Sequence, residues 1–408
     1  MRSFRNFIAA FCMAAALSVN SCAPTEPHSV LELPAGEGNS RNSEGDFIVL
    51  KGGDILFAYS KFIGGKGDDH DRCVIAARVS KDKGESWSSE DRIIATNEVE
   101  PEGNVMSVSL LRLQDGRIAL FYLQKIAGDE ETVATRVMMK TSADEGESWS
   151  DETDCTAGMT LGYRVVNNAR IIRLASGRIL IPVAWHRFHG SGDYDMDGDA
   201  ELYGLWSDDD GKTWHRGNGF YIDEVEGTEG KNGAYVEGCQ ENQLCRIAEE
   251  DRTGRRVVTQ EPGIMEMRDG SVLMYIRADT GYQWYASSKD GGETWGDLRP
   301  APYVGPLSPA TMRRLADGRL LLIWNDHEGR EDLGRARTPL TLATSVDEGQ
   351  SWPAKKILEG SYDPDNRTHY HYCYTAALEL RDRILLAYCA EDNLKHLRIT
   401  SVPLRWLP

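Results

Sequence analysis

Short apolar runs that each follow a turn recur six times along the chain. They are residues 52–60, 115–123, 176–184, 269–277, 317–325 and 381–389. β-Branched and aromatic residues occupy both faces of each run, as expected of strands that are buried inside a stack of sheets. The pattern therefore predicts six inner strands, one in each of six repeated units.

A second pattern, Ser-x-Asp-x-Gly-x-Ser/Thr-Trp, recurs five times between these runs. Its copies are residues 80–87, 142–149, 207–214, 288–295 and 345–352. The Asp accepts hydrogen bonds from its own turn, the Gly takes a backbone angle closed to other residues, and the Trp buries a large area on a neighbouring strand. Six units of about four strands each predict an all-β protein, a six-bladed β-propeller.

The predicted propeller spans residues 41–408 as one domain. The last unit lacks the second pattern, so we expect it to close by taking a strand from the N-terminal region. Longer spacing between the third and fourth units leaves room for an insertion around residues 218–245. The 40 Gly and 10 Trp residues of the 408-residue chain suit a β-rich fold with many turns.

The first residues predict an export signal. Two arginines precede an apolar run, residues 7–19, that is too short to span a bilayer as a helix. We interpret residues 1–22 as a lipoprotein signal peptide that ends in "VNSC" at Cys22, and residues 23–40 as a flexible tether. A signal peptide with an incidental cysteine is the alternative. The protein is then exported, as an outer-membrane lipoprotein or to the periplasm or cell surface.

Net charge and cysteine spacing limit the partners. A formal charge of −18 disfavours nucleic acid and anionic lipid surfaces, so membrane contact is expected only through a lipid on Cys22. An acidic substrate would need a local cluster of arginines. No His/Cys spacing indicates zinc, and no cofactor is predicted; Cys239 and Cys245 are close enough in sequence for a disulfide. We expect a monomer.

One predicted hairpin carries an acid and a base to the same edge. In residues 260–277, "QEPGIMEMRDGSVLMYIR", Glu261 and Arg277 lie almost equally far from the turn. Both charges therefore reach the open end of the hairpin, which in a propeller can face the central funnel. A structural ion pair at a strand end is the simpler interpretation.

The repeated turns on six units resemble the Asp boxes of the bacterial sialidase (exo-α-neuraminidase) superfamily, and the resemblance covers the chain after the tether. Residues 260–277 are similar to the family's Asn-Glu-Pro stretch that ends in Asn-x-Arg. This implies that Glu261 partners the nucleophile and that Arg277 is one of three arginines that bind the substrate carboxylate. "RTPLTLATSVDEGQSWP", from Arg337, resembles the segment that carries another of the three, with Arg335 as the alternative.

Two further segments match the family. "CYTAALEL" resembles its Tyr-Ser-x-Leu stretch, which makes Tyr374 the implied nucleophile, with Tyr370 and Tyr372 as alternatives. "GGKGDDHDRC" stands where the family keeps its acid/base aspartate, and spacing from the first Asp box favours Asp69 over Asp68. Neighbouring carboxylates in this run are expected to raise the pKa of the acid.

The N-terminal unit departs from the family pattern. The family's Phe-Arg-Ile-Pro is absent, and Arg41 in "NSRNSEGDFIVL" is the nearest match for the remaining carboxylate arginine. A second arginine of this unit, which contacts ring substituents, is replaced near Lys61. The identity of the sugar is therefore more open than the class of reaction.

The resemblance implies a retaining exo-glycosidase that removes a terminal α-linked 2-keto sugar acid, such as sialic acid, KDN or Kdo, from a glycan. Guanidinium forks suit a carboxylate, and a neutral phenol approaches a carbon beside that carboxylate without repulsion. A non-catalytic glycan-binding propeller is one alternative. A polysaccharide lyase is another, with a base from residues 186–190 or from His369 and His371. Individually, each candidate side chain also suits a core or surface position.

Overall fold

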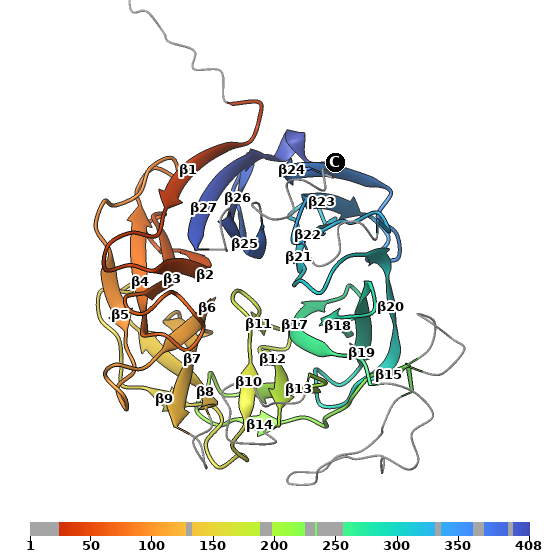
Figure 1. Cartoon of the computed structure of the whole chain (residues 1–408), viewed down its shortest axis with the longest axis horizontal. Coiled ribbons are helices and arrows are strands. Elements are labelled where there is room, and N and C mark those ends of the chain that lie inside the picture. The colour runs from red at the N-terminus through yellow and green to blue at the C-terminus, as the bar shows by residue number, and fades with distance from the viewer. Residues whose placement is uncertain are drawn as a thin grey trace, which may run out of the picture.

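The computed structural model of the chain describes residues 24–127, 133–187, 198–224, 233–234, 256–330, 336–361, 371–390 and 395–408. Its strands form six blades around a central axis (Figure 1), which confirms the predicted six-bladed β-propeller. The predicted signal peptide with Cys22, and also Cys239 and Cys245, lie outside the described residues. None of the described residues form a helix long and apolar enough to cross a membrane.

The blades are antiparallel sheets, and in blades I to V the strands run outward from the axis in chain order. Blade I contains β2 (Arg41–Val49), β3 (Ile55–Phe62), β4 (Cys73–Ser80) and β5 (Arg92–Ala95). Blade II contains β6 (Val105–Arg112), β7 (Ile118–Ala127), β8 (Val133–Ser142) and β9 (Thr153–Asp154). Blade III contains β10 (Tyr163–Val165), β12 (Ile179–His186), β13 (Glu201–Ser207) and β14 (His215–Arg216), and β11 (Ile172–Arg173) also pairs with β12.

The second half of the ring follows the same plan. Blade IV contains β17 (Thr259–Glu266), β18 (Val272–Ala278), β19 (Tyr282–Ser288) and β20 (Gly296–Val304). Blade V contains β21 (Thr311–Arg314), β22 (Leu320–Asn325), β23 (Leu340–Ser345) and β24 (Ala354–Glu359). Blade VI contains β25 (Cys373–Glu379), β26 (Arg383–Ala390), β27 (His396–Pro403) and β1 (His28–Leu33). In the expected insertion, β15 (Asp223–Glu224) pairs with β16 (Gly233–Ala234).

The six apolar runs form the second strand of each blade and not the innermost one. The run at residues 269–277 is β18, which pairs with β17 on one edge and β19 on the other and is buried along its whole length. Because this strand has a neighbouring strand on each edge and a neighbouring blade on each face, neither of its faces meets solvent. This explains why apolar residues occupy both faces of the run. The innermost strands are thus left to carry polar residues at the funnel.

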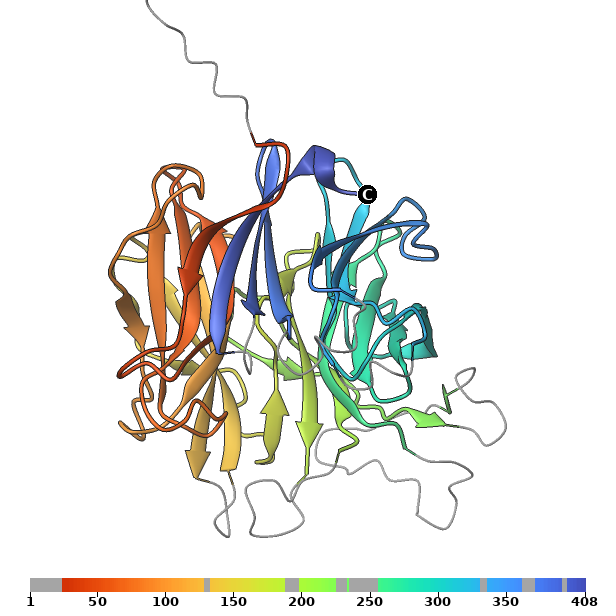
Figure 2. The same ribbon diagram turned by 45° about the horizontal axis from the view of Figure 1, so that its top comes forward.

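The N-terminal strand closes the ring. β1 pairs with β27, so blade VI takes its outermost strand from the other end of the chain, as predicted (Figure 2). The expectation of a flexible tether over residues 23–40 is wrong for residues 28–33. Without β1, the edge of β27 would expose unpaired backbone groups, and Leu33 would lose its buried place between blades I and VI.

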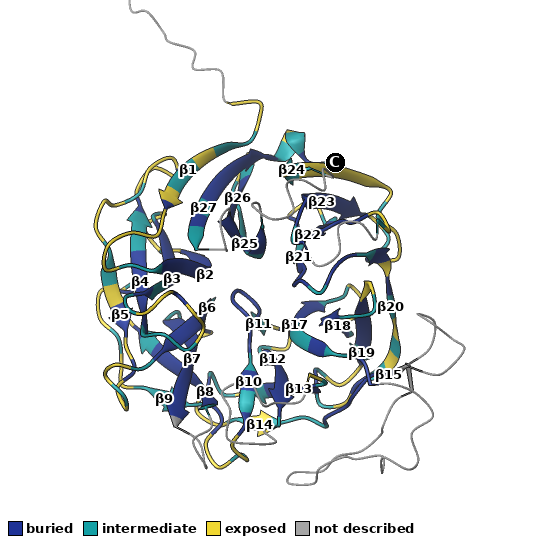
Figure 3. Ribbon diagram, viewed as in Figure 1, coloured by how far each residue is buried: buried dark blue, intermediate teal, exposed yellow. Residues whose placement is uncertain are grey.

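The core lies between the blades. The buried apolar side chains of the described residues form six clusters, each centred on two adjacent blades, and Phe62 and Cys73 of blade I also join the cluster of blades II and III. Inner and middle strands are accordingly buried, whereas β24 is largely exposed (Figure 3).

The loop of blade III between β10 and β11, which contains residues 168–170, reaches across the axis and forms the floor of the funnel. Asn168 Nδ2 donates to the backbone oxygen of Gly45 at 2.8 Å and to that of Tyr374 at 3.1 Å. Arg170, which is 1% exposed, donates to the hydroxyl groups of Tyr275 at 3.0 Å and Thr311 at 3.1 Å. This segment therefore ties blade III to blades I, IV, V and VI.

Candidate active site

The hairpin β17–β18 brings its acid and base together at the open end. Gln260 is opposite Arg277, and a bulge between Gln260 and Gly263 leaves Glu261 without a partner in the ladder. Arg277 Nη1 donates to Glu261 Oε2 at 2.6 Å, and the two side chains are 9% and 11% exposed. The pair therefore forms at the funnel end of blade IV.

Bulges recur on the innermost strands of four blades. Each contains a non-glycine residue with positive φ: Glu44 at 49°, Ser107 at 62°, Glu261 at 44° and Tyr374 at 58°. An extra residue in one strand redirects side chains, and backbone strain of this kind gathers at functional sites. The repeated bulge indicates a site where the innermost strands converge.

Tyr374 meets Glu261 across the funnel. The hydroxyl of Tyr374 on blade VI donates to Glu261 Oε1 on blade IV at 3.2 Å. Burial, together with the Glu261 carboxylate, raises the pKa of Tyr374 well above its ordinary value. The phenol is therefore neutral at neutral pH, and Glu261 is placed to accept its proton.

Arg337 lies beside the same phenol. Its guanidinium carbon is 5.4 Å from the centre of the Tyr374 ring, and its Nη1 donates to Cys373 Sγ at 3.1 Å. The backbone oxygen of Arg337 accepts from the N–H of Tyr372 at 2.8 Å. Tyr372 is itself 4% exposed and packs in the core between blades V and VI. The alternatives Arg335 and Tyr370 lie outside the described residues.

Arg41 and Asp69 join the cluster from blade I. Arg41 is 8% exposed at the start of β2, and its Nη1 donates to Asp69 Oδ1 at 2.6 Å. Asp71 instead accepts the backbone N–H groups of residues 66–68, which makes it a structural cap for the loop. Asp68 is exposed.

The expectation that neighbouring carboxylates raise the pKa of the acid is wrong for Asp69 in the free protein. Burial alone would raise this pKa, but the cations Arg41 and Lys125 outweigh it, and the pKa is lowered. The side chain is 52% exposed. Asp69 is therefore ionised when no ligand is bound.

The structure thus gathers all six predicted site residues in one cluster. The charges of Glu261, Arg337 and Arg277 lie close enough to shift the pKa of the Tyr374 phenol. Tyr374 in turn shifts the pKa of Arg41, which forms an ion pair with Asp69. They come from blades I, IV and VI and from the loop before β23 of blade V. Three cations, one phenol and two carboxylates can together bind an anion and move protons beside it.

Sequence reasoning missed two buried groups of this cluster. Glu44 is 4% exposed, its Oε2 has no hydrogen-bond partner among the described residues, and burial raises its pKa to about 8. Lys125 donates to the backbone oxygen of Asp69, and burial lowers its pKa to about 8. Lys125 lies near the end of the second strand of its blade, as Arg277 does in blade IV. This shared position is the sequence feature by which Lys125 could have been predicted. Nothing in the sequence marks Glu44.

Among the described residues, no three His, Cys, Asp or Glu side chains gather closely enough to hold a metal ion. Lys61, which stands near the family's second blade I arginine, donates to Asp91 at 2.5 Å within its own blade. His371 Nδ1 accepts the backbone N–H of Arg337 at 3.1 Å, and burial followed by the Arg337 charge lowers its pKa. Of the other proposed lyase bases, His186 is buried on β12, and His189 and His369 lie outside the described residues.

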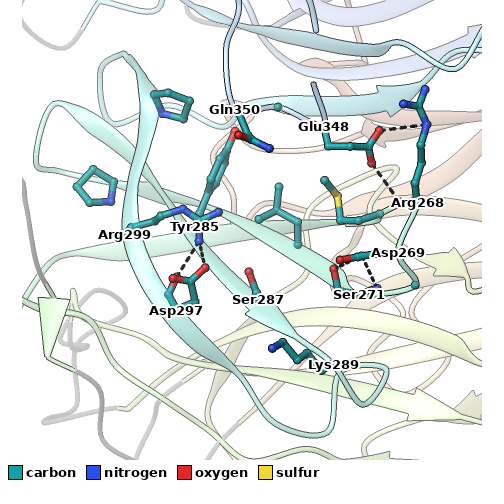
Figure 4. Close-up of a pocket in the computed structure, with 16 residues that line it drawn as sticks. Arg268, Asp269, Ser271, Tyr285, Ser287, Lys289, Asp297, Arg299, Glu348 and Gln350 are labelled. Carbon is teal, nitrogen blue, oxygen red and sulfur yellow. Dashed lines mark hydrogen bonds and ion pairs between the residues drawn. The ribbon is translucent and has the colours of Figure 1, made fainter. Parts of the chain in front are cut away.

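A groove of about 1030 Å³ lies at the other end of the hairpin, between blades IV and V (Figure 4). Four of its charged groups form two ion pairs, Arg268 with Glu348 and Arg299 with Asp297, and Asp269 accepts from Ser271. It begins at the β17–β18 turn, and at about 3.3 Å per residue that turn is roughly 25 Å from Glu261. The groove is therefore separate from the cluster of predicted site residues.

Comparisons with known proteins agree with this architecture. Residues 53–384 match the family of BNR repeat-like domains. An anhydrosialidase of Macrobdella decora is 25% identical over 262 residues, which cover 60% of this chain and 28% of that protein. The chain thus matches less than a third of that relative's length.

Solved structures with the same fold include two that cover at least 90% of this chain. A protein of unknown function from Dyadobacter fermentans has a TM-score of 0.64 at 18% identity, covering 92% of this chain and 99% of that one. The Hadza microbial sialidase Hz136 has a TM-score of 0.65 at 17% identity, covering 90% and 66%. At such identities the likeness shows a sialidase-like propeller fold.

Proposed function

The chain belongs to the family of BNR repeat-like domains, and from its cluster of site residues we propose that it is a sialidase-type exo-glycosidase. Its substrate in this proposal is a glycan that ends in an α-linked 2-keto sugar acid. The observation that carries the proposal is the hydrogen bond from Tyr374 to Glu261 beside three arginines. A phenol that is paired with a carboxylate among fixed cations suits attack on a carbon that itself bears a carboxylate.

The arginines would bind the substrate carboxylate, because a guanidinium can donate to both of its oxygens and keeps its charge. As the phenol oxygen forms its bond to the anomeric carbon, Glu261 would accept the phenol proton. The glycosyl–tyrosine intermediate would then be hydrolysed by water, which returns Tyr374 and Glu261 to their starting states.

Asp69 would protonate the leaving oxygen, and its pairing with Arg41 suggests how it gains that proton. A bound carboxylate competes with Asp69 for Arg41, so substrate binding weakens the interaction that lowers the pKa of Asp69. Asp69 can then pick up a proton when substrate arrives and can act later as the base that activates water.

The experiment measures release of a fluorescent phenol from an α-sialoside by the wild-type protein and by Asp69→Ala and Asp68→Ala. We expect turnover by the wild type, a loss of about 10²–10⁴-fold in Asp69→Ala with this activated leaving group or a natural sialoside, and near-normal turnover in Asp68→Ala. Loss in Asp68→Ala alone would move the acid/base role to that residue. Absence of turnover with sialosides, KDN glycosides and Kdo glycosides would refute the proposal.

The product separates the remaining possibilities. NMR of the released sugar distinguishes a free α-keto acid from an internal anhydro sugar, which the name of the Macrobdella decora anhydrosialidase suggests as an outcome. Binding without turnover would indicate a glycan-binding propeller. An unsaturated product that absorbs ultraviolet light would indicate a lyase, with His371 as the base to test first.

A further inference from the structure

Two cysteines form a thiol pair directly beneath the candidate active site. Cys373 and Cys389 are opposite each other in the register of β25 and β26, and they are 1% and 0% exposed. Cys373 immediately precedes Tyr374, the residue on the bulge. Neither thiol takes part in the mechanism proposed above.

The thiol pair connects two of the three arginines. Arg337 Nη1 donates to Cys373 Sγ at 3.1 Å, and Ser43 Oγ lies 3.1 Å from Cys389 Sγ. Arg41 Nη2 donates to the same Ser43 oxygen at 3.1 Å. Because Cys373 and Cys389 are opposite each other in the ladder, a chain of neighbouring groups runs from Arg41 through Ser43, Cys389 and Cys373 to Arg337, and it joins blades I, VI and V.

The three arginines differ in their partners. Arg277 and Arg41 each form an ion pair with a carboxylate, whereas the described residues place no carboxylate within ion-pair distance of Arg337. Burial, together with its hydrogen bond to Cys389, raises the pKa of the Cys373 thiol. A neutral thiol is a weak acceptor, so it can orient the Arg337 guanidinium without neutralising its charge.

The thiol of Cys389 ionises more readily than that of Cys373. Burial alone would raise the pKa of Cys389, but the hydrogen bond from Cys373 and the Arg41 charge lower it to about 6. Cys373 can therefore donate its S–H to Cys389 while it accepts from Arg337. The orientation of Arg337, which donates to Cys373, and that of Arg41, which reaches Cys389 through Ser43, therefore both depend on how the two thiols lie against each other.

We propose that Cys373 and Cys389 are positioning residues that hold Arg337 and Arg41 in the orientation in which both bind the substrate carboxylate. The inference rests on the function proposed above. Because the arginines bind the carboxylate in the ground state and in the transition state alike, loss of a thiol should weaken binding more than it slows the chemical step.

The test compares Cys373→Ala, Cys373→Ser, Cys389→Ala and Cys389→Ser with Cys155→Ala. Cys155 is a matched control, because it is 1% exposed in the core between blades II and III. We expect either active-site Ala variant to raise KM for the sialoside about tenfold, the effect of losing one hydrogen bond to a charged group, with kcat changed less than about twofold. Serine keeps an acceptor and should restore most of the loss.

Thermal unfolding separates this role from a structural one. Cys155→Ala should lower Tm about as much as Cys373→Ala and leave KM unchanged. Normal KM in the active-site variants, or loss of kcat with no rescue by serine, would overturn the inference while the proposed function stands. A wild-type protein that neither turns over nor binds a sugar acid would overturn both.

Discussion

The two ends of each blade are built in different ways, and the β17–β18 hairpin displays both. At its turn, Asp269 Oδ1 accepts from both the N–H and the hydroxyl of Ser271, and Arg268 pairs with Glu348 of the next blade. At its open end, Nε of the buried Arg277 has no hydrogen-bond partner among the described residues, and Glu261 has positive φ.

The Asp-box end satisfies its polar groups locally. In the blade III box, Asp209 accepts from the N–H of Thr213 at 2.9 Å and its hydroxyl at 2.7 Å, and Trp214 packs against Phe121 of blade II. The hydrogen bonds of such a turn come from its own sequence, so the turn can be repeated in several blades. The funnel end depends on residues from several blades, so each contributes a different side chain. The comparison assigns stability to one end and chemistry to the other.

The largest effect should come from Tyr374→Phe. Removal of the hydroxyl deletes the proposed nucleophile, so we expect kcat for the α-sialoside to fall about a thousandfold or more while Tm changes little. Steady-state kinetics and calorimetry measure the two quantities. Tyr372→Phe, two residues upstream in the core, is the control and should keep its activity; a larger loss there would move the nucleophile to Tyr372.

Glu261→Gln should have the next largest effect. The amide has one acceptor oxygen where the carboxylate has two, one for Arg277 and one for Tyr374, and it cannot take the phenol proton, so kcat should fall about 10²–10⁴-fold. The pH dependence of kcat should lose the limb that reports the base. Activity within about twofold of the wild type would exclude Glu261 from proton transfer and leave it as the structural partner of Arg277.

The opposite end is tested by Asp209→Ala. We expect Tm to fall by roughly 2–4 °C and kcat/KM to stay unchanged, because the box is distant from the site. Burial alone would raise the pKa of Asp209, but the groups of Thr213 lower it to about 2 from 3.8. This stabilisation is therefore present above about pH 4 and lost as pH falls towards 2.

Acid unfolding followed by tryptophan fluorescence checks this pH window. The wild type should lose its Tm advantage over Asp209→Ala between about pH 4 and 2. Lys212→Ala, in the same turn, is the control, because its backbone N–H still donates to Asp209. A fall in kcat/KM comparable to that of Tyr374→Phe would break the division between the two ends.

The sequence predicts the ring more completely than the funnel. Asp boxes and apolar second strands repeat, so the blade number and the closing strand could be inferred from one chain. Glu261 and Arg277 were found together because hairpin geometry is local. Glu44 was not found, although it shares β2 with Arg41, because nothing in the sequence marks the bulge that carries it. The Cys373–Cys389 pair was not found because its contacts with Arg337 and Ser43 cross between blades. The lowered pKa of Asp69 depends on Arg41, which lies 28 residues away on β2 of the same blade, and on Lys125, which lies on β7 of the next blade.

Glu44 offers the smallest predicted effect and the finest test of the funnel end. With a pKa of about 8, it is neutral at pH 6 and ionised at pH 9, where its charge would oppose an anionic substrate beside Arg41. KM of the wild type should therefore rise a few-fold above pH 8, and Glu44→Gln should show a smaller rise. Asp69, Glu261 and Cys389 also face Glu44, and with the pKa of Cys389 at about 6, that thiol is already ionised below this window.

Lys125 titrates in the same window, because burial lowers its pKa to about 8, and it also loses positive charge near Asp69. Lys125→Arg keeps that charge at pH 9 and isolates the contribution of Glu44. In this background, KM should still rise above pH 8, and adding Glu44→Gln should flatten the profile. Identical pH profiles with and without Glu44→Gln would show that the buried carboxyl does not act on the substrate. Glu44 would then be a residue that supports its strand bulge, in contrast to the funnel residues that contact the ligand.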